Sequence, residues 1–428
     1  MLLMVIVFIV LLALGMPIAF VVGLTGIAWF LQNPDFPLTI AVQRAVSATQ
    51  SFAFLAVPFF IFAGNLMNHT GITKYLIIFA RLLTRRMTGG MAQVSVLLSL
   101  MMGGISGSAV ADAAMEARIL GPEMTKRGYP KGYTAGLLCF TSMIVATIPP
   151  ALGLIIYGFV GGVSIGRLFM AGIIPGLMMT VLYMIVVAIT TKIRKLDLPE
   201  PDAKAPSFPE VFSAFRKSVW ALLFPVILIV GIRFGVFTPT EAGAFAVVYA
   251  ILTGILVYRE LTMKGFLISV KESFIDTGGI LMIISLSAIF GFGLTVENVP
   301  MVLGSFLTGI TTNPRVLMVI VVIFLVIVGL FIDSNVVVLL FTPIILPVLT
   351  PLGVDPVHFG IVMMTMATMG VFTPPVGTGI YIVCSIMECP IEEYMVESLP
   401  FFFSLIGLAI FFIFIPDIIL WLPNRVFG

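Results

Sequence analysis

The sequence predicts an all-α protein that crosses a membrane many times and consists of two inverted-topology repeats. Three observations lead to this fold class: an apolar composition, two polar interruptions inside apolar segments, and a set of motifs that recurs in the second half. Of the 428 residues, 60% are hydrophobic and 10% are charged, and the mean hydropathy is +1.20. Soluble domains carry about 25% charged residues. We expect roughly 10–12 spans, since apolar runs of about 20 residues cross a bilayer.

Composition and motifs exclude several classes of function. The net charge is only +2 and no basic patch occurs, so we expect membrane lipid and no nucleic acid as a partner. Cys139, Cys384 and Cys389 lack metal-ligand spacing. No G-x-x-x-x-G-K-[ST] motif is present, so any transport must draw on an ion gradient or a partner. Met1 to Leu31 has no basic n-region and no small-residue cleavage site, which predicts no cleaved signal peptide.

The first polar interruption is the Gly- and Ser-rich run 103–108. Glycine costs about 1 kcal/mol against alanine in a helix, and serine competes for backbone hydrogen bonds. The flanking apolar arms, about 88–103 and 110–121, would reach roughly 18–24 Å, less than a bilayer core of about 30 Å. We therefore predict a re-entrant helical hairpin at about 88–121, with an ion-binding tip.

Two other interpretations of this run remain open. Gly103 and Gly107 have the G-x-x-x-G spacing of closely packed helices. Residues 104–107 also fit the G-x-S-G pattern of intramembrane serine proteases, which need a histidine base beside the serine. The candidates are His69, at the end of an expected span, and His358, in the opposite half, so the protease is the weakest interpretation.

The second polar interruption is Asp333-Ser334-Asn335. Asp333 has 17 uncharged residues before it and 21 after it, and an acid so deep in a membrane is rare unless it is functional or paired. We predict a second re-entrant hairpin at about 313–352 with this tripeptide at its tip. In the alternative, both arms cross the bilayer and the tripeptide is a solvated turn.

Tandem prolines interrupt two further apolar segments, at Thr147–Gly153 and Thr373–Gly377. A proline pair removes two backbone donors and restricts the preceding residue, so each helix must break there. The freed carbonyls lie beside threonine hydroxyls, and such hard oxygen donors suit a sodium ion. A simple proline kink is the alternative.

The interruptions recur in the same order in both halves. Pro149-Pro150 reappears as Pro374-Pro375, and Pro175 as Pro400. Residues 78–131, around the first hairpin, carry seven basic residues, whereas residues 306–358 carry only Arg315; the seven are Arg81, Arg85, Arg86, Arg118, Lys126, Arg127 and Lys131. Positive residues favour the cytoplasmic side, so the hairpins should enter from opposite sides. We expect repeats at 1–191 and 218–428, joined by a cytoplasmic linker at 192–217.

Four motifs in order resemble the large membrane subunit of tripartite ATP-independent periplasmic (TRAP) transporters: GGISGSAVADAA (103–114), ATIPPALGLIIYG (146–158), LFIDSN (330–335) and GVFTPPVGTGIY (370–381). The resemblance implies a sodium-coupled importer of organic acids in the bacterial inner membrane, working by an elevator movement, and no enzymatic activity. It also implies a small membrane subunit and a periplasmic binding protein as partners. Because the sequence begins directly at its first span, we expect the small subunit to be a separate chain.

The resemblance also assigns sites. One sodium site would combine the first tip with the first proline break: Ser106, Gly107, Ser108, Thr147, Pro149 and Gly153. The other would combine the second tip with the second break: Asp333, Ser334, Asn335, Thr373, Pro374 and Gly377. The substrate would lie near Ser108, Pro150, Asn335, Pro375 and Thr378.

The substrate and the coupling scheme have alternatives. Sialic acid and C4-dicarboxylates are the expected substrate classes, with a slight preference for sialic acid, although no buried arginine marks a carboxylate clamp. A stand-alone ion-coupled anion symporter with the same hairpins is the alternative function. Asp112 and Glu116 lie one helical turn apart, and they would face a polar cavity, pair with Arg118 or cap a helix.

Overall fold

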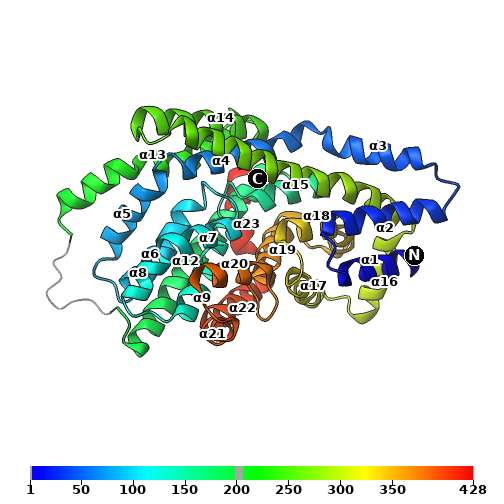
Figure 1. The fold of residues 1–428 in the computed structure, drawn as a ribbon. Coiled ribbons are helices and arrows are strands. Elements are labelled where there is room, and N and C mark those ends of the chain that lie inside the picture. The colour runs from blue at the N-terminus through cyan, green and yellow to red at the C-terminus, as the bar shows by residue number, and fades with distance from the viewer. Residues whose placement is uncertain (1, 198–205, 428) are drawn as a thin grey trace.

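A computed structural model describes residues 2–197 and 206–427, and within these ranges the chain forms helices and no strands. The helices gather in two groups (Figure 1). The first, which we call the frame group, comprises α1 (Leu2–Ala13), α2 (Ile18–Gln32), α3 (Leu38–Thr49), α4 (Ala56–Asn68), α5 (Ile72–Thr84), α13 (Phe208–Arg233), α14 (Pro239–Leu252), α15 (Met263–Val296) and α16 (Val299–Ile310). Helix α15 runs across this group and packs on α2, α3 and α4 (Figure 1).

The second group carries the two expected hairpins, and we call it the hairpin group. Its first half contains α6 (Gly90–Met102), α7 (Ala109–Ile119), α8 (Gly121–Lys126), α9 (Lys131–Thr141), α10 (Met143–Thr147), α11 (Leu152–Gly161) and α12 (Ile165–Arg194). Its second half contains α17 (Pro314–Gly329), α18 (Ser334–Leu349), α19 (Pro356–Val371), α20 (Thr378–Met387), α21 (Ile391–Glu397), α22 (Leu399–Phe414) and α23 (Pro416–Phe427). Short 3-10 helices lie at Phe52–Leu55 and Thr350–Leu352, and a short π-helix lies at Thr253–Val257.

The expectation of a multi-pass helical membrane protein is confirmed. Among the described residues, five helices are long and apolar enough to cross a membrane, and the number rises to as many as eight if each of three bent helix pairs is one span. The total of 10–12 stays a prediction, because short apolar helices such as α4 and α6 fall outside this criterion.

Each expected hairpin consists of two short helices separated by a break. The arms α6 and α7 contain 13 and 11 residues, and α17 and α18 contain 16 residues each. At 1.5 Å per residue the longest arm reaches only about 24 Å, less than a bilayer core of about 30 Å. The lengths of α6 and α7 suit a re-entrant hairpin. In contrast, α18 with the following 3-10 turn, Ser334–Leu352, is one of the five helices long enough to cross, so the second re-entrant hairpin stays a prediction. The inverted relation between the two halves stays a prediction.

The interval assigned to the linker, 192–217, is partly helical. Helix α12 continues to Arg194, and α13 begins at Phe208 behind a capping box in which Ser207 and Glu210 each bond the other's backbone amide. Arg216 and Lys217 therefore belong to α13. The residues from 198 to 205 lie outside the described ranges.

The two halves of the hairpin group interlock. Helix α7 of the first hairpin packs on α20, and α18 of the second hairpin packs on α11. The Tyr157 hydroxyl on α11 donates to the Pro356 carbonyl at the start of α19, at 2.6 Å. Each hairpin is thus held by the broken helix of the opposite half as well as by its own.

The contact between α17 and α19 depends on two facing glycines. A Cβ atom added to Gly370 would lie 2.6 Å from Gly329 Cα and 2.6 Å from the Val326 carbonyl oxygen. Both neighbours are backbone atoms, which cannot move aside without shifting a helix. Glycine at both positions lets the hairpin arm lie directly against α19.

We predict that Gly370→Ala lowers the apparent Tm of the purified protein, because overpacking of this kind costs about 1–3 kcal/mol. Gly278→Ala on α15 is the matched control, since no described atom lies within 4 Å of its Cβ position and alanine is the better helix former. Thermal unfolding in detergent measures both. Equal melting curves for Gly370→Ala and the parent chain would contradict this packing.

Candidate ion and substrate site at the hairpin tips

The tip of the first hairpin is a compact turn with two serine hydroxyls. After α6 ends at Met102, the amides of Ile105 and Ser106 both donate to the Met102 carbonyl, at 2.8 and 3.0 Å. Ser108 then caps α7 by accepting from the Ala111 amide at 3.4 Å. The Ser106 hydroxyl lies 3.4 Å from the Ser108 amide nitrogen. Both serines are half-buried, so their oxygens line the turn without leaving the protein.

Gly107 brings this tip against the first proline break. Its φ of +63° belongs to the left-handed region, which glycine adopts without a steric cost. A Cβ there would lie 3.0 Å from the Pro150 carbonyl oxygen and 3.2 Å from the Leu152 amide. That amide donates to the Gly107 carbonyl at 3.4 Å. The structure therefore brings Gly107 of the first expected sodium site against Pro150 and Leu152 of the break. The described hydrogen-bond neighbours of the Thr147 hydroxyl, in contrast, are Met143 and Met179.

The first break separates α10 from α11 and bends the segment by 47°. The Pro149–Pro150 bond is cis. The Thr147 hydroxyl is buried and donates to the Met143 carbonyl at 3.1 Å. Because its hydrogen is used there, lone pairs of the hydroxyl oxygen remain as acceptors.

The second break repeats these features between α19 and α20. The Pro374–Pro375 bond is also cis, and the Thr373 hydroxyl donates to the Met369 carbonyl at 2.7 Å. The Gly377 amide donates to the Thr373 carbonyl at 3.1 Å, and the Val371 carbonyl oxygen also faces Gly377. Carbonyl oxygens therefore converge inside this break.

The tip of the second hairpin begins α18. The Asp333 carboxylate caps that helix by accepting from the Asn335 amide at 2.9 Å. Ser334 is buried, and Asp333 and Asn335 are half-buried. None of the ion pairs between described residues includes Asp333. The acid at the tip is thus capped but has no described cationic partner.

Asn335 reaches across to the first half of the chain. Its Oδ1 atom is buried and has no hydrogen-bond partner among the described residues. It lies 3.2 Å from the position of a Cβ on Gly153, beside a cavity of about 10 Å³ that Asn335, Ile156 and Ile284 help to line. We assigned Asn335 and Gly153 to different sodium sites, and the structure places them side by side.

The residues expected around the substrate differ in exposure. Pro150 is buried, Ser108 and Asn335 are half-buried, and Pro375 and Thr378 are exposed. Together the tips and breaks present hydroxyl, carbonyl, amide and carboxylate oxygens. Hard oxygen donors of this kind bind small hard cations and exclude soft metals.

Sequence reasoning missed two frame-group contacts of the first tip. A Cβ on Gly64 of α4 would lie 3.3 Å from the Ile105 carbonyl oxygen, and Gly104 abuts the ring of Pro225 on α13. The only sequence signal is that small or cyclic residues interrupt two apolar segments. Such residues indicate that another segment packs closely against the helix, but they do not identify that segment.

The histidines lie away from the serines of the first tip. His358 Nε2 lies 2.8 Å from the Phe412 carbonyl oxygen, and His69 Nε2 lies 3.9 Å from Glu272 on the frame group. Among the described hydrogen bonds, neither histidine reaches Ser106. No described hydrogen bond therefore supports the protease interpretation.

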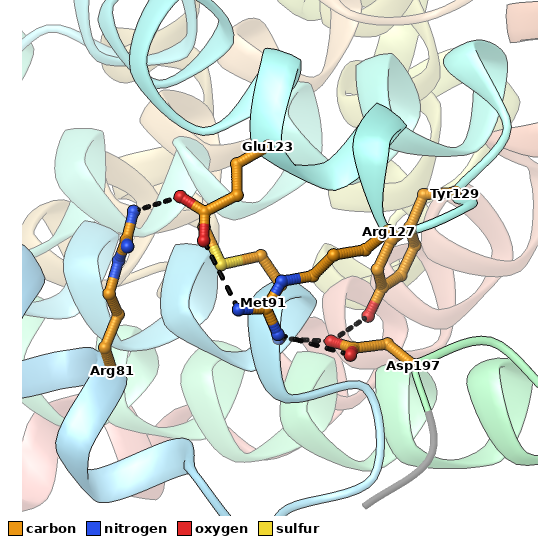
Figure 2. Close-up of polar contacts among 6 residues, drawn as sticks. All are labelled: Arg81, Met91, Glu123, Arg127, Tyr129 and Asp197. Atoms are coloured by element: carbon orange, nitrogen blue, oxygen red, sulfur yellow. Dashed lines mark hydrogen bonds and ion pairs between the residues drawn. The ribbon is translucent and has the colours of Figure 1, made fainter.

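Asp197, just after α12, ties together the base of the first hairpin (Figure 2). Its carboxylate accepts from the Met91 amide at 2.9 Å, the Tyr129 hydroxyl at 3.1 Å and Arg127 at 3.3 Å. Burial and the neighbouring Asp197 carboxylate raise the pKa of Tyr129. The hydroxyl therefore stays protonated and keeps donating to Asp197.

Glu123 on α8 connects the same base to the frame group. Figure 2 shows its carboxylate between two arginines: Arg81, which comes from α5, and Arg127, at 3.3 Å. Two of the seven basic residues counted in the sequence thus take part in this network. It holds the start of α6 and the end of α8 in place, which positions the tip at the far end of the arms.

Comparisons with known proteins agree with the motifs. Residues 5–418 match the family described as "Tripartite ATP-independent periplasmic transporter, DctM component". The sialic acid TRAP transporter large permease protein SiaM of Vibrio cholerae is 34% identical over 97% of this chain and 96% of that protein. The C4-dicarboxylate TRAP transporter large permease protein DctM of Pseudomonas aeruginosa is 32% identical over 94% and 93%. The 2,3-diketo-L-gulonate TRAP transporter large permease protein YiaN of Escherichia coli is 34% identical over 95% of each chain.

A solved structure shares the fold at low sequence identity. The YdaH transporter of Alcanivorax borkumensis superposes with a TM-score of 0.61 over 87% of each chain, at 15% identity. This likeness concerns the fold alone. The match to the DctM family over nearly the whole sequence identifies the protein at a finer level: the chain belongs to the large permease subunits of TRAP transporters, which are multi-pass proteins of the bacterial inner membrane.

Proposed function

We propose that the chain is the permease subunit of a sodium-coupled importer of organic acid anions, with its ion and substrate sites at the two hairpin tips. The observation that most directly supports this proposal is the contact between the first tip and the first proline break, where the Gly107 carbonyl accepts a hydrogen bond from the Leu152 amide. The Ser106 and Ser108 hydroxyls belong to the same tip, and the Pro150 carbonyl oxygen of the break faces Gly107. Oxygen donors beside unwound helices are the means by which secondary transporters bind sodium.

The substrate class follows from the chemistry that the relatives' names share. Sialic acid, 2,3-diketo-L-gulonate and C4-dicarboxylates, named for three relatives, are all carboxylic acids. We propose a carboxylate substrate, with a slight preference for sialic acid. Sodium ions entering with the anion would offset its charge, and each net positive charge moved inward gains about 2.3 kcal/mol per 100 mV.

Alternating access by an elevator movement is the second part of the proposal. The hairpin group holds both tips and both breaks, whereas the frame group contributes Gly64 and Pro225 at the first tip. A group that holds the whole site can carry it across the membrane by sliding against the frame group. The proposed site itself then keeps its geometry during the movement.

Two partners complete the proposal: a small membrane subunit on a separate chain and a periplasmic protein that delivers the solute. The word tripartite in the family description supports three components. The frame group offers a surface in the membrane, since large apolar side chains such as Phe208 and Phe212 on α13 are exposed.

We predict that Ser106→Ala and Asp333→Ala weaken the sodium dependence of uptake. Asp333→Asn is the sharper variant, because asparagine still caps a helix while it removes the charge. A contact with a charged group contributes about 1.5–3 kcal/mol, so the half-saturating sodium concentration should rise roughly 10- to 100-fold. Sodium titrations of solute uptake by proteoliposomes measure this.

Ser404→Ala provides the control for these variants. Ser404 lies on α22, and within the described part of the chain its hydroxyl bonds only the Phe401 carbonyl of its own helix. Its sodium curve should match that of the parent chain. Unchanged curves for all three site variants would remove the sodium assignment.

We also predict that uptake needs all three components. Proteoliposomes with the complete set should accumulate the acid, and omission of either partner should abolish accumulation because delivery or assembly fails. An acidic-solute screen with candidate binding proteins identifies the substrate. Full uptake by this chain alone would instead support the stand-alone symporter.

A further inference from the structure

Two buried acids lie between the arms of the first hairpin, away from its tip. Asp112 and Glu116 on α7 are 1% and 0% exposed. Their carboxyl groups lie within hydrogen-bond distance of the hydroxyls of Ser95 and Ser99 on α6. The Ser95 hydroxyl also forms a hydrogen bond with Thr141 on α9. Of the three alternatives left open for these acids, the described contacts show hydroxyl partners from neighbouring helices, and Arg118 is exposed.

One end of this cluster runs from Glu116 to α9. Glu116 Oε2 lies 2.5 Å from Ser95 Oγ, which lies 2.8 Å from Thr141 Oγ1. The Thr141 hydroxyl donates to the Leu137 carbonyl at 2.9 Å. While its single hydrogen is used there, Thr141 can only accept a hydrogen bond from Ser95.

The other end runs from Glu116 to Asp112. Glu116 Oε1 lies 2.9 Å from Ser99 Oγ, and Ser99 Oγ lies 3.3 Å from Asp112 Oδ2. Ser99 has one hydrogen and therefore donates to only one of the two carboxyl groups. The remaining Asp112 oxygen, Oδ1, is buried without a hydrogen-bond partner among the described residues.

Hydrogen counting favours protonation of both acids. The contacts Glu116–Ser95, Ser95–Thr141, Thr141–Leu137, Glu116–Ser99 and Ser99–Asp112 each need a hydrogen, and the three hydroxyls supply only three. One proton on Glu116 Oε2 and one on Asp112 Oδ2 complete the set. With these two protons in place, hydrogen bonds can run in one direction, from Asp112 through Ser99, Glu116, Ser95 and Thr141 to the Leu137 carbonyl.

No described cation takes the place of these protons. The ion pairs between described residues include neither acid. Helices α6, α8, α9, α10 and α20 pack on α7, and α6 and α10 carry no titratable side chain. Lys131 on α9 pairs with Glu388, and Glu123 on α8 pairs with arginines. The other titratable residues on α8, α9 and α20 are Lys126, Tyr133, Cys139, Tyr381 and Cys384. Two unpaired buried carboxylates would be strongly unfavourable in such surroundings.

We infer that Asp112 and Glu116 form a proton-binding site that holds two protons between the arms of the first hairpin, separate from the sodium sites at the tips. The ligand is the proton itself. While both are bound, the pair is neutral and its hydroxyl chain joins α6, α7 and α9. Loss of the protons places two like charges side by side, so the packing of the arms weakens as the pH rises. This inference does not depend on sodium coupling.

Infrared spectroscopy of the full-length protein in lipid bilayers tests the site. We expect the parent chain at neutral pH, without sodium, to show carbonyl-stretch absorption of protonated carboxylic acids that Asp112→Asn/Glu116→Gln lacks. The amides suit the same contacts, since each carries both a donor and an acceptor. Glu123→Gln is the control and should retain the absorption, because Glu123 pairs with arginines.

Two results would overturn the inference. In one, the parent-minus-variant spectrum at neutral pH contains only carboxylate bands. In the other, adding sodium at constant pH converts the acid bands to carboxylate bands, which would make the pair a sodium site. If the double variant does not fold, Asp112→Asn and Glu116→Gln singly should each remove part of the absorption, and an absorption unchanged in both refutes the assignment.

Discussion

Inside a bilayer, a backbone amide or carbonyl that leaves a helix must find another partner in the protein, because hydrocarbon offers none. The hairpin group follows from this constraint. At the first break the Leu152 amide donates to the Gly107 carbonyl of the facing tip. At the second break the freed Phe372 carbonyl accepts from the Tyr394 hydroxyl at 2.8 Å. The breaks are therefore stable only where other segments of the hairpin group contact them, so the site and the packing of this group form together.

The same constraint separates the two ends of the first hairpin. At its base, where basic residues gather, Glu123 and Asp197 form ion pairs with arginines. Between the arms, hydroxyl groups are the partners that Asp112 and Glu116 find. An acid near the membrane surface can keep its charge beside a cation, whereas an unpaired acid between buried helices is more stable when neutral. The position of each carboxyl group along the hairpin thus sets its chemistry.

Local patterns in the sequence predicted a large part of this fold. The expected arms at 88–103 and 110–121 correspond to α6 and α7, and the hairpin expected at 313–352 corresponds to α17 and α18 with the following 3-10 turn. Glycine, serine and proline change the helix stability of the segment that contains them, so the helix breaks they cause can be predicted without knowledge of the tertiary structure. The contact of Asn335 with Gly153, and the meeting of Ser95 and Ser99 with the α7 acids, depend on how separate helices pack. The sequence offered several partners for these residues and no means of choosing among them.

Joint measurement of sodium and solute flux tests the central claim most directly, namely that the two tips couple ion and solute entry. The complete transporter in proteoliposomes would be supplied with radiolabelled sodium and the identified acid, with the membrane potential clamped by potassium and valinomycin. The account predicts that sodium enters in a fixed ratio to the acid and that an inside-negative potential speeds both fluxes. Accumulation of the acid without sodium entry, or sodium entry that does not change when the acid is added, would contradict it.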